Sequence, residues 1–247
     1  MRFAVLADVH ANLEAFRACL DHARARGADR IVLLGDLVGY GADPGAVLDL
    51  AMEEMGRGGL ALLGNHDEAA IGTGATGMND SAAAAISWTR AKLSETHRRF
   101  LGGLPLTIEE EGCLFVHADP SAPAKWRYVT DSESANRSLQ ATTAHATICG
   151  HVHRPALYSL GDTGKLIAFR PVEDAPVPLT RGRRWLGVLG AVGQPRDGNP
   201  AACYAIIDTH PMQVTWLRVP YDVATAAAKI RVAGLPPGLA ERLFVGR

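Results

Sequence analysis

Short apolar runs alternate with longer amphipathic stretches over the first 150 residues. Five apolar runs are too short for helices and predict strands buried on both faces; they cover residues 3–7, 31–34, 60–63, 114–116 and 147–149. Between them, apolar residues recur at helical spacing; the predicted helices run from Leu13 to a stop at Gly27 and over 45–55, 81–93, 96–101 and 131–141. This alternation is typical of a layered α/β fold.

The pattern changes after residue 155, where short strands alternate with turns. A second, mostly antiparallel sheet is expected there, built from residues 156–160, 165–169, 184–189, 203–208 and 213–218. From Tyr221 onward we expect a helix that is broken at Pro236-Pro237, and the Gly-rich stretch 72–80 predicts a mobile loop. No repeat or linker interrupts the chain, so we expect residues 1–247 to form a single domain.

Polar residues follow each of the five buried strands. They are Asp8-Val9-His10, Gly35-Asp36, Gly64-Asn65-His66-Asp67, His117 and His151-Val152-His153. Ligands bind beyond the carboxyl ends of strands in open α/β sheets, so these five ends are expected to gather on one rim. One Asp-x-His tripeptide is a weak signal, but five such ends in this order are hard to obtain by chance.

Imidazole and oxygen ligands without thiolates are typical of a site for divalent transition metals such as Mn, Fe, Zn, Co or Ni. Two such ions need a shared ligand, and Asp36 is the natural bridge because a carboxylate has two oxygens. The predicted ligands of two ions are Asp8, His10, Asp36, Asn65, His117, His151 and His153.

His66 then remains for catalysis. We expect Asp67 to orient its ring and to raise its pKa, as a general acid requires. The two metals would lower the pKa of a shared water, so that a metal-bound hydroxide attacks phosphorus while His66 protonates the leaving oxygen. The chemistry that this predicts is hydrolysis of a phosphate ester.

Composition narrows the choice of partners. The net charge of −1 is unlike that of a protein that neutralises a nucleic acid, so neither DNA nor RNA is expected as a partner. Four scattered cysteines predict free buried thiols in a reducing cytoplasm; they are Cys19, Cys113, Cys149 and Cys203. The chain begins directly with a predicted strand and holds no apolar run long enough for a membrane span, so no membrane partner is expected.

The order D-x-H, G-D, G-N-H-[ED], H and G-H-x-H resembles the calcineurin-like metallophosphoesterase superfamily. The resemblance implies a four-layer α-β-β-α sandwich with two mixed β-sheets flanked by helices. It also implies two ligand sets that share Asp36, with His66 as the catalytic histidine. One set is Asp8, His10, Asp36 and His153, and the other is Asp36, Asn65, His117 and His151.

A closer resemblance covers nearly the whole chain. Residues 35–44, Asn79 with Trp88-Thr89, and residues 193–198 are similar to the prokaryotic diadenosine-tetraphosphatase-like phosphoesterases. The resemblance implies a small phosphomonoester or phosphodiester substrate, with a nucleotide as the first hypothesis.

Three positions depart from related patterns. Gly39-Tyr40-Gly41 lacks the arginine of protein phosphatases, which argues against that activity. Asp119 and Ala191 stand where relatives tend to carry serine. The Asp119 carboxylate near the site would either repel phosphate or hold an additional cation.

Arg196 is the candidate substrate-phosphate contact, because its planar fork suits phosphate; a surface arginine in a turn is the alternative. Asn12 and Asn79 are further candidates for substrate binding, and Asn12 has the alternative of capping the helix that follows it. Lys125-Trp126-Arg127 either stacks a base or forms a surface loop.

A catalytically silent binding or scaffold protein on the same fold is the competing hypothesis, and a nuclease is a weaker one. The oligomeric state, a homo-oligomer included, is left open.

Overall fold

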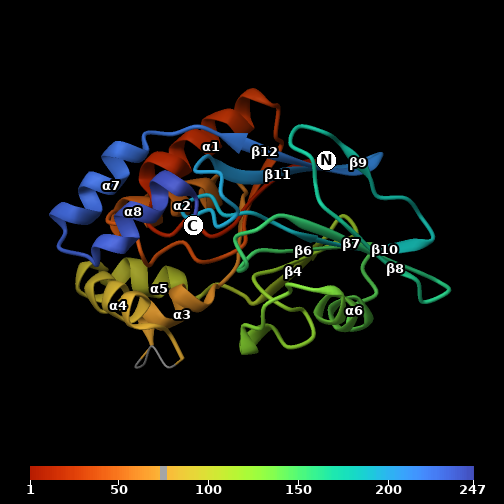
Figure 1. The fold of residues 1–247 in the computed structure, drawn as a ribbon, viewed down its shortest axis with the longest axis horizontal. Helices are drawn as coiled ribbons and strands as arrows, with labels where there is room; N and C mark the ends of the chain where they lie inside the picture. The colour runs from red at the N-terminus through yellow and green to blue at the C-terminus, as the bar shows by residue number, and fades with distance from the viewer. Residues whose placement is uncertain (73–76) are drawn as a thin grey trace.

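The computed structural model describes residues 1–72 and 77–247, and contains two mixed six-stranded β-sheets packed face to face (Figure 1). The first sheet has the order β3-β2-β1-β11-β12-β9, with bounds Leu60–Ala61, Arg30–Leu33, Arg2–Leu6, Ala202–Thr209, Met212–Val219 and Val177–Pro178. The second has the order β4-β5-β6-β10-β7-β8, with bounds Thr107–Glu110, Cys113–Val116, Ala146–Cys149, Arg183–Val188, Ala156–Gly161 and Leu166–Phe169.

Eight α-helices flank the sheets within the described residues. They are α1 (Leu13–Ala25), α2 (Pro44–Gly56), α3 (Asn65–Ile71), α4 (Asp80–Lys92), α5 (Glu95–Gly102), α6 (Ser132–Gln140), α7 (Val223–Val232) and α8 (Pro237–Val245). α1 packs on β11 and β12 of the first sheet, and α6 packs on β7, β8 and β10 of the second (Figure 1). The predicted four-layer α-β-β-α sandwich is confirmed.

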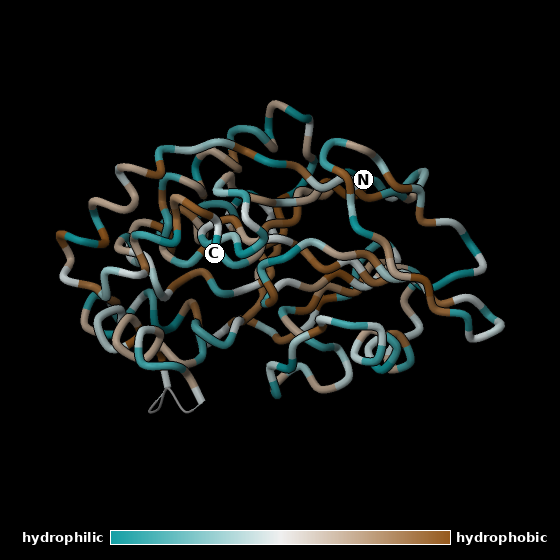
Figure 2. The backbone as a smooth tube through the Cα atoms, viewed as in Figure 1, coloured by the Kyte–Doolittle hydropathy of each residue, from teal (hydrophilic) through white to brown (hydrophobic). Residues whose placement is uncertain are grey.

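Strand β1 shows how the hydrophobic pattern produces these layers. Side chains alternate between the two faces of a strand. Phe3 and Val5 lie in the apolar cluster between the sheets, whereas Ala4 and Leu6 lie in the cluster beneath the helices. The rings of Phe3 and Phe115 meet edge to face at 5.5 Å and join the two sheets. A strand of this kind needs apolar residues on both faces, and Figure 2 shows the resulting brown strands at the centre of the molecule.

The prediction that the strands after residue 155 form a second sheet of their own is wrong. β11 pairs antiparallel with β1, with Phe3 opposite Ile207, and therefore completes the first sheet together with β12. β10 pairs in parallel with β6, and β7 pairs antiparallel with β10, so these strands extend the second sheet. Each half of the chain thus contributes to both sheets, because the free edges of β1 and β6 are closed by strands from the second half.

Other expectations have mixed outcomes. The C-terminal helix breaks as predicted, because Pro236 precedes α8 and Pro237 is its first residue. Helix α3 and strand β4 were not predicted, and β3 ends at Ala61, earlier than expected. Of the predicted loop 72–80, residues 73–76 lie outside the described residues. Among the described helices, none combines the length and the apolar character that a membrane crossing requires.

Candidate metal centre

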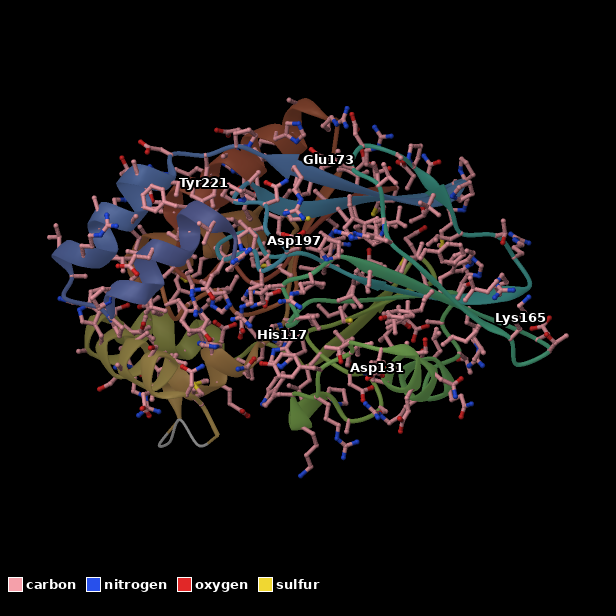
Figure 3. The ribbon with its side chains drawn as sticks, viewed as in Figure 1. His117, Asp131, Lys165, Glu173, Asp197 and Tyr221 are labelled. Carbon is pink, nitrogen blue, oxygen red and sulfur yellow. The ribbon has the colours of Figure 1, made fainter. Side chains whose placement is uncertain are left out.

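The polar ends of five strands meet at one place between the two sheets. Asp8, His10 and Asp36 follow β1 and β2, and Asn65 begins α3 after β3. His117 follows β5, and His151 and His153 follow β6, so the second sheet supplies these three side chains. Figure 3 shows His117 near the middle of the molecule. The expectation of one shared rim therefore holds for two facing sheets rather than for a single sheet.

Three groups of these side chains place their ligand atoms within 4.8 Å of one another. The groups are Asp8, His10 and His153; His10, Asp36 and His66; and Asp36, His117 and His151. Asp36 belongs to two groups, as a bridging carboxylate would. On one side of Asp36, His10 Nε2 lies 3.7 Å from Oδ2. On the other, His117 Nε2 lies 3.4 Å from the same oxygen and 3.1 Å from Asn65 Oδ1.

Each of the four histidines is held from behind by a backbone carbonyl. His10 Nδ1 lies 3.2 Å from the Val38 oxygen, and His117 Nδ1 lies 2.7 Å from the Leu34 oxygen. His153 Nδ1 lies 2.6 Å from the Gln194 oxygen.

His151 is held through its other nitrogen, Nε2, which lies 2.9 Å from the Trp126 oxygen. A carbonyl only accepts hydrogen bonds, so each of these four ring nitrogens carries the proton. The opposite nitrogen of each ring is thereby left to offer a lone pair.

The distances between the facing lone pairs indicate whether a cation fits among them. His10 Nε2 and His153 Nε2 lie 3.1 Å apart, and Asp8 Oδ1 lies 3.3 Å from His153 Nε2. These atoms are all acceptors when the rings are neutral, and the side chains are buried. Buried acceptors that face one another need a shared cation. The donor set therefore fits a divalent metal, and the role of the seven residues as its ligands stays a prediction.

The pKa values of the buried side chains also favour a bound cation. Burial lowers the pKa of His117, but the Asp36 carboxylate outweighs burial and raises that pKa to about 9. Burial raises the pKa of Asp36, while His117 and His66 together hold it well below its usual value. The pocket therefore favours a cation between these residues, and a divalent metal would take the place of the proton.

The backbone at the site is strained. Five predicted ligands adopt the left-handed region that side chains other than glycine rarely occupy; they are Asp8 (φ 57°), His10 (49°), Asp36 (52°), His151 (68°) and His153 (61°). Sharp turns directly after the strands aim these side chains inward. The residues that turn the chain after each strand are therefore the same residues that are predicted to bind metal.

His66 lies beside the same cluster and is buried. Its ring centroid is 4.8 Å from that of His10 and 4.5 Å from that of Tyr40. Its backbone N–H donates to Asp36 Oδ1 at 2.7 Å, while the buried Nδ1 has no hydrogen-bond partner among the described residues. This nitrogen lies beside Gly39 and is held by no described acceptor.

The expected role of Asp67 is wrong. Its two oxygens accept backbone N–H groups from Val38 and Gly64 at 3.1 Å, so Asp67 joins two loops and does not orient His66. Burial and the nearby Asp36 raise the pKa of Asp67 to about 7. The pKa of His66 is lowered, chiefly by burial, rather than raised.

The three predicted substrate contacts have different environments. Arg196 lies over the Tyr40 ring, 5.9 Å from its centroid, and is therefore close to the cluster. Asn12 is used internally, because its amide donates to the Gly193 oxygen and to Tyr221, and its oxygen caps α1. Its alternative as a helix cap is confirmed. Asn79 is exposed and caps α4 through Ala82 N; as a substrate contact it stays a prediction.

Residues 119–130 form a loop beside the predicted ligands, and two of its aromatic rings contact histidines of the cluster. The Tyr128 ring stacks on His151 with a centroid distance of 4.2 Å, and the Trp126 ring meets His117 at 5.7 Å. Asp119 holds this loop against α6, because it accepts hydrogen bonds from Ser138 and Arg137. The expectation that Asp119 repels phosphate or holds a cation is wrong, since its carboxylate is already saturated.

The backbone carbonyls of Gln194 and Trp126, which hold His153 and His151, could not be identified from the sequence, because every residue has a backbone carbonyl. The stacking of Tyr128 on His151 was hard to predict, because the only signal in the sequence is an aromatic residue in the segment that follows His117.

The chain is similar to known proteins in sequence and in fold. A family model described as the calcineurin-like phosphoesterase superfamily domain matches residues 1–212. An uncharacterized protein from Methanocaldococcus jannaschii is 35% identical over 249 residues, covering 99% of this chain and 98% of the relative.

Solved structures extend the comparison. A metallophosphoesterase from Sphaerobacter thermophilus has a TM-score of 0.87 at 34% identity, covering 100% of this chain and 99% of that one. A hypothetical protein from Pyrococcus horikoshii has a TM-score of 0.79 at 19% identity, with coverage of 100% and 98%, and so shares the fold.

Proposed function

This chain belongs to the calcineurin-like phosphoesterase superfamily, and from that premise we propose that it hydrolyses phosphate esters at a dinuclear metal site. The observation that supports the proposal most directly is the pair of facing acceptors, His10 Nε2 and His153 Nε2, at 3.1 Å. Two proposed ligand sets that share Asp36 give further support to this proposal. One set comprises Asp8, His10, Asp36 and His153, and the other Asp36, Asn65, His117 and His151.

Divalent ions held by these sets would supply Lewis acidity toward the phosphoryl group and toward water. The chain itself contributes positioning. Carbonyl contacts behind His10, His117, His151 and His153 fix the direction of each ring, which reduces reorganisation during the reaction. Burial of the cluster excludes bulk water and strengthens these interactions.

His66 is the candidate general acid. Burial lowers the pKa of its ring, so any proton that the ring gains is readily given up. In this role His66 would protonate the leaving oxygen of the ester. Arg196, beside Tyr40, would bind a phosphate group of the substrate through its guanidinium. A small phosphomonoester or phosphodiester, with a nucleotide as the first choice, is the proposed substrate class.

The proposal is tested by His66→Ala and Asp36→Asn in protein loaded separately with Mn, Fe, Co, Ni, Zn or Mg. p-Nitrophenyl phosphate and bis(p-nitrophenyl) phosphate distinguish monoester from diester turnover. We expect His66→Ala to lose at least about 10²-fold in kcat while keeping its metal content. Asp36→Asn should lose metal and activity together, because the two ligand sets share this residue.

His22→Gln is the matched control, since His22 lies on α1 and its ring contacts Tyr204 outside the cluster. It should keep both metal content and turnover. Unchanged turnover in His66→Ala would exclude the assigned acid. A metal-loaded wild-type protein that is inert toward every ester would instead support the binding or scaffold hypothesis.

A further inference from the structure

Two adjoining cavities lie beside the metal centre. The smaller has a volume of about 450 Å³, the larger about 860 Å³, and both are lined by Arg154, Pro155, Ala156 and Arg196. The smaller cavity is also lined by Val152, which lies between two predicted ligands, and by Tyr128, which stacks on His151. A molecule in this cavity therefore lies directly beside the metal ligands.

The larger cavity carries an excess of positive charge. Its lining includes Arg154, Arg170, Arg196, Arg218 and Arg247 against the carboxylates of Glu173 and Asp197. Arg218 is paired with Asp197. In the part of the chain that the structure describes, the other four arginines form no ion pair, so the lining sets four guanidinium groups against two carboxylates, that of Glu173 and the α-carboxylate of Arg247 itself. In the view of Figure 3, Asp197 lies between Glu173 and His117.

Arg154 and Arg196 are held close to the metal centre by backbone contacts. Arg154 Nε donates to the Arg196 carbonyl at 2.7 Å, and the Arg196 backbone N–H donates to the His153 carbonyl at 3.2 Å. The Arg196 guanidinium also donates to Gln194 Oε1 at 3.2 Å. Arg154 and Arg196 carry like charges, so an anion bound by both side chains reduces their mutual repulsion. Fixing them in advance lowers the ordering cost of binding that anion.

The smaller cavity has a different character. Tyr128 and Tyr158 line it together with Val152 and Pro155, which gives it aromatic and apolar walls. Such walls suit an organic group, whereas guanidinium forks suit phosphate. The aromatic pocket therefore adjoins the metal centre through Tyr128 and Val152, and adjoins the larger, arginine-lined cavity through Arg154 and Arg196. Four arginines of the larger cavity together form what we call the arginine trough; they are Arg154, Arg170, Arg196 and Arg247.

We propose that the arginine trough binds a second phosphate group of the substrate while the metal centre holds the scissile one. The aromatic pocket then receives the organic part that joins the two phosphates. This inference rests on the proposed function and deepens it, because it selects bisphosphorylated esters over esters that carry one phosphate. A second phosphate on a nucleoside and one in a polyphosphate chain offer the same chemistry to the trough.

The test compares thymidine 3′,5′-bisphosphate, thymidine 5′-monophosphate and tripolyphosphate by calorimetric titration. The His66→Ala background is used with Mn present, so that the ligands are not consumed. We expect the bisphosphate to bind at least tenfold more tightly than the monophosphate. Arg154→Gln should reduce this ratio at least fivefold. Arg181→Gln is the control, because Arg181 is exposed and lines a separate cavity, and it should leave the ratio unchanged.

Turnover gives a second readout in the otherwise wild-type protein. p-Nitrophenyl thymidine 5′-phosphate is compared with the same ester that carries a 3′-phosphate. The added phosphate should raise kcat/KM at least tenfold, mainly through KM, and Arg154→Gln should remove most of this gain. If tripolyphosphate instead shows the tightest Arg154-dependent binding, the second phosphate belongs to a polyphosphate chain.

Equal binding of mono- and bisphosphate by the wild-type trough would overturn the inference, as would an Arg154→Gln variant with the wild-type ratio and an unchanged melting temperature. The binding comparison does not need turnover. A protein that binds the bisphosphate preferentially but hydrolyses no ester would contradict the proposed function while supporting the trough.

Discussion

His10 Nε2 and His153 Nε2 face each other at 3.1 Å, although the other nitrogen of each ring is held by a backbone carbonyl. Neutral rings in this arrangement place two lone pairs against each other in a buried site. A cation removes the conflict, so metal binding is expected to stabilise the fold as well as to support chemistry.

The first prediction concerns this stabilisation. A divalent ion at a free concentration of 100 times its dissociation constant should raise the free energy of unfolding by about 2.7 kcal/mol for each site. For a chain of this size, that corresponds to a rise in melting temperature of roughly 5–10 °C. Thermal unfolding with Mn or Zn, and again with EDTA, measures the difference. A melting temperature that is the same in both conditions would contradict the metal centre.

The second prediction concerns Gly39, whose φ is +89°. A Cβ at this position would lie 2.5 Å from His66 Nδ1, so Gly39→Ala should displace the His66 ring. We expect kcat to fall at least about 10²-fold, because a misplaced acid cannot reach the leaving group. Metal content, measured by mass spectrometry, should stay at the wild-type level.

Gly58→Ala is a matched control for backbone strain. Gly58 has a φ of +91°, and a Cβ there would meet nothing within 4 Å. Both variants should lose stability through backbone strain, but only Gly39→Ala should lose turnover. Equal activity losses in the two variants would show that strain, not the position of His66, governs the rate.

The third prediction concerns Asp119, which holds the 119–130 loop against α6. Asp119→Ala leaves Arg137 and Ser138 without their acceptor and should cost about 2–4 kcal/mol in the free energy of unfolding. The loop carries the Trp126 carbonyl that holds His151, so metal affinity should also fall by about tenfold. Urea unfolding and metal titration measure the two effects.

Asp131→Ala provides the comparison, because Asp131 caps the same helix without anchoring the loop. It should destabilise the protein less than Asp119→Ala and leave metal affinity unchanged. An Asp119→Ala protein with wild-type metal affinity would show that the loop does not position His151.

The fourth prediction concerns pH. The hydrogen bond from Arg2 lowers the pKa of Asp208, so the pair stabilises the fold above the ordinary carboxyl pKa and loses this effect as the pH falls below it. Asp208→Asn should therefore cost roughly 0.5–1 kcal/mol at pH 7, because Arg2 is partly exposed. The difference from wild type should shrink progressively once the pH falls below the ordinary carboxyl pKa. Urea unfolding at neutral and at acidic pH checks this, and a cost that persists in acid would contradict it.

Sequence patterns predicted the strands and the gathering of polar residues well, for a physical reason. Buried parallel strands need continuous apolar runs, and a residue directly after such a run, such as Asp36, has little freedom to lie elsewhere. The pairing of β11 with β1 was not predictable, because 200 residues separate the two and several strands have similar apolar faces. Helix α3 was missed because its first turn, residues 65–67, is formed by polar residues that were assigned only as a motif following the strand.

The surroundings of the site were harder to predict than its side chains. The Asp67 carboxylate is used by the backbone of Val38 and Gly64, a choice that depends on how three loops meet. The arginine trough joins Arg154 to Arg170, Arg196 and Arg247, which come from separate loops and carry no common motif. Such groupings appear only once the two sheets are placed against each other.

Left-handed backbone at Asp8, His10, Asp36, His151 and His153 sets the stability of the fold against the placement of predicted ligands. Each such residue costs about 1–3 kcal/mol relative to a relaxed conformation, so replacing one by glycine would ease the fold while removing a predicted ligand. Variants of this chain that are selected for thermal stability alone are therefore expected to bind metal less tightly.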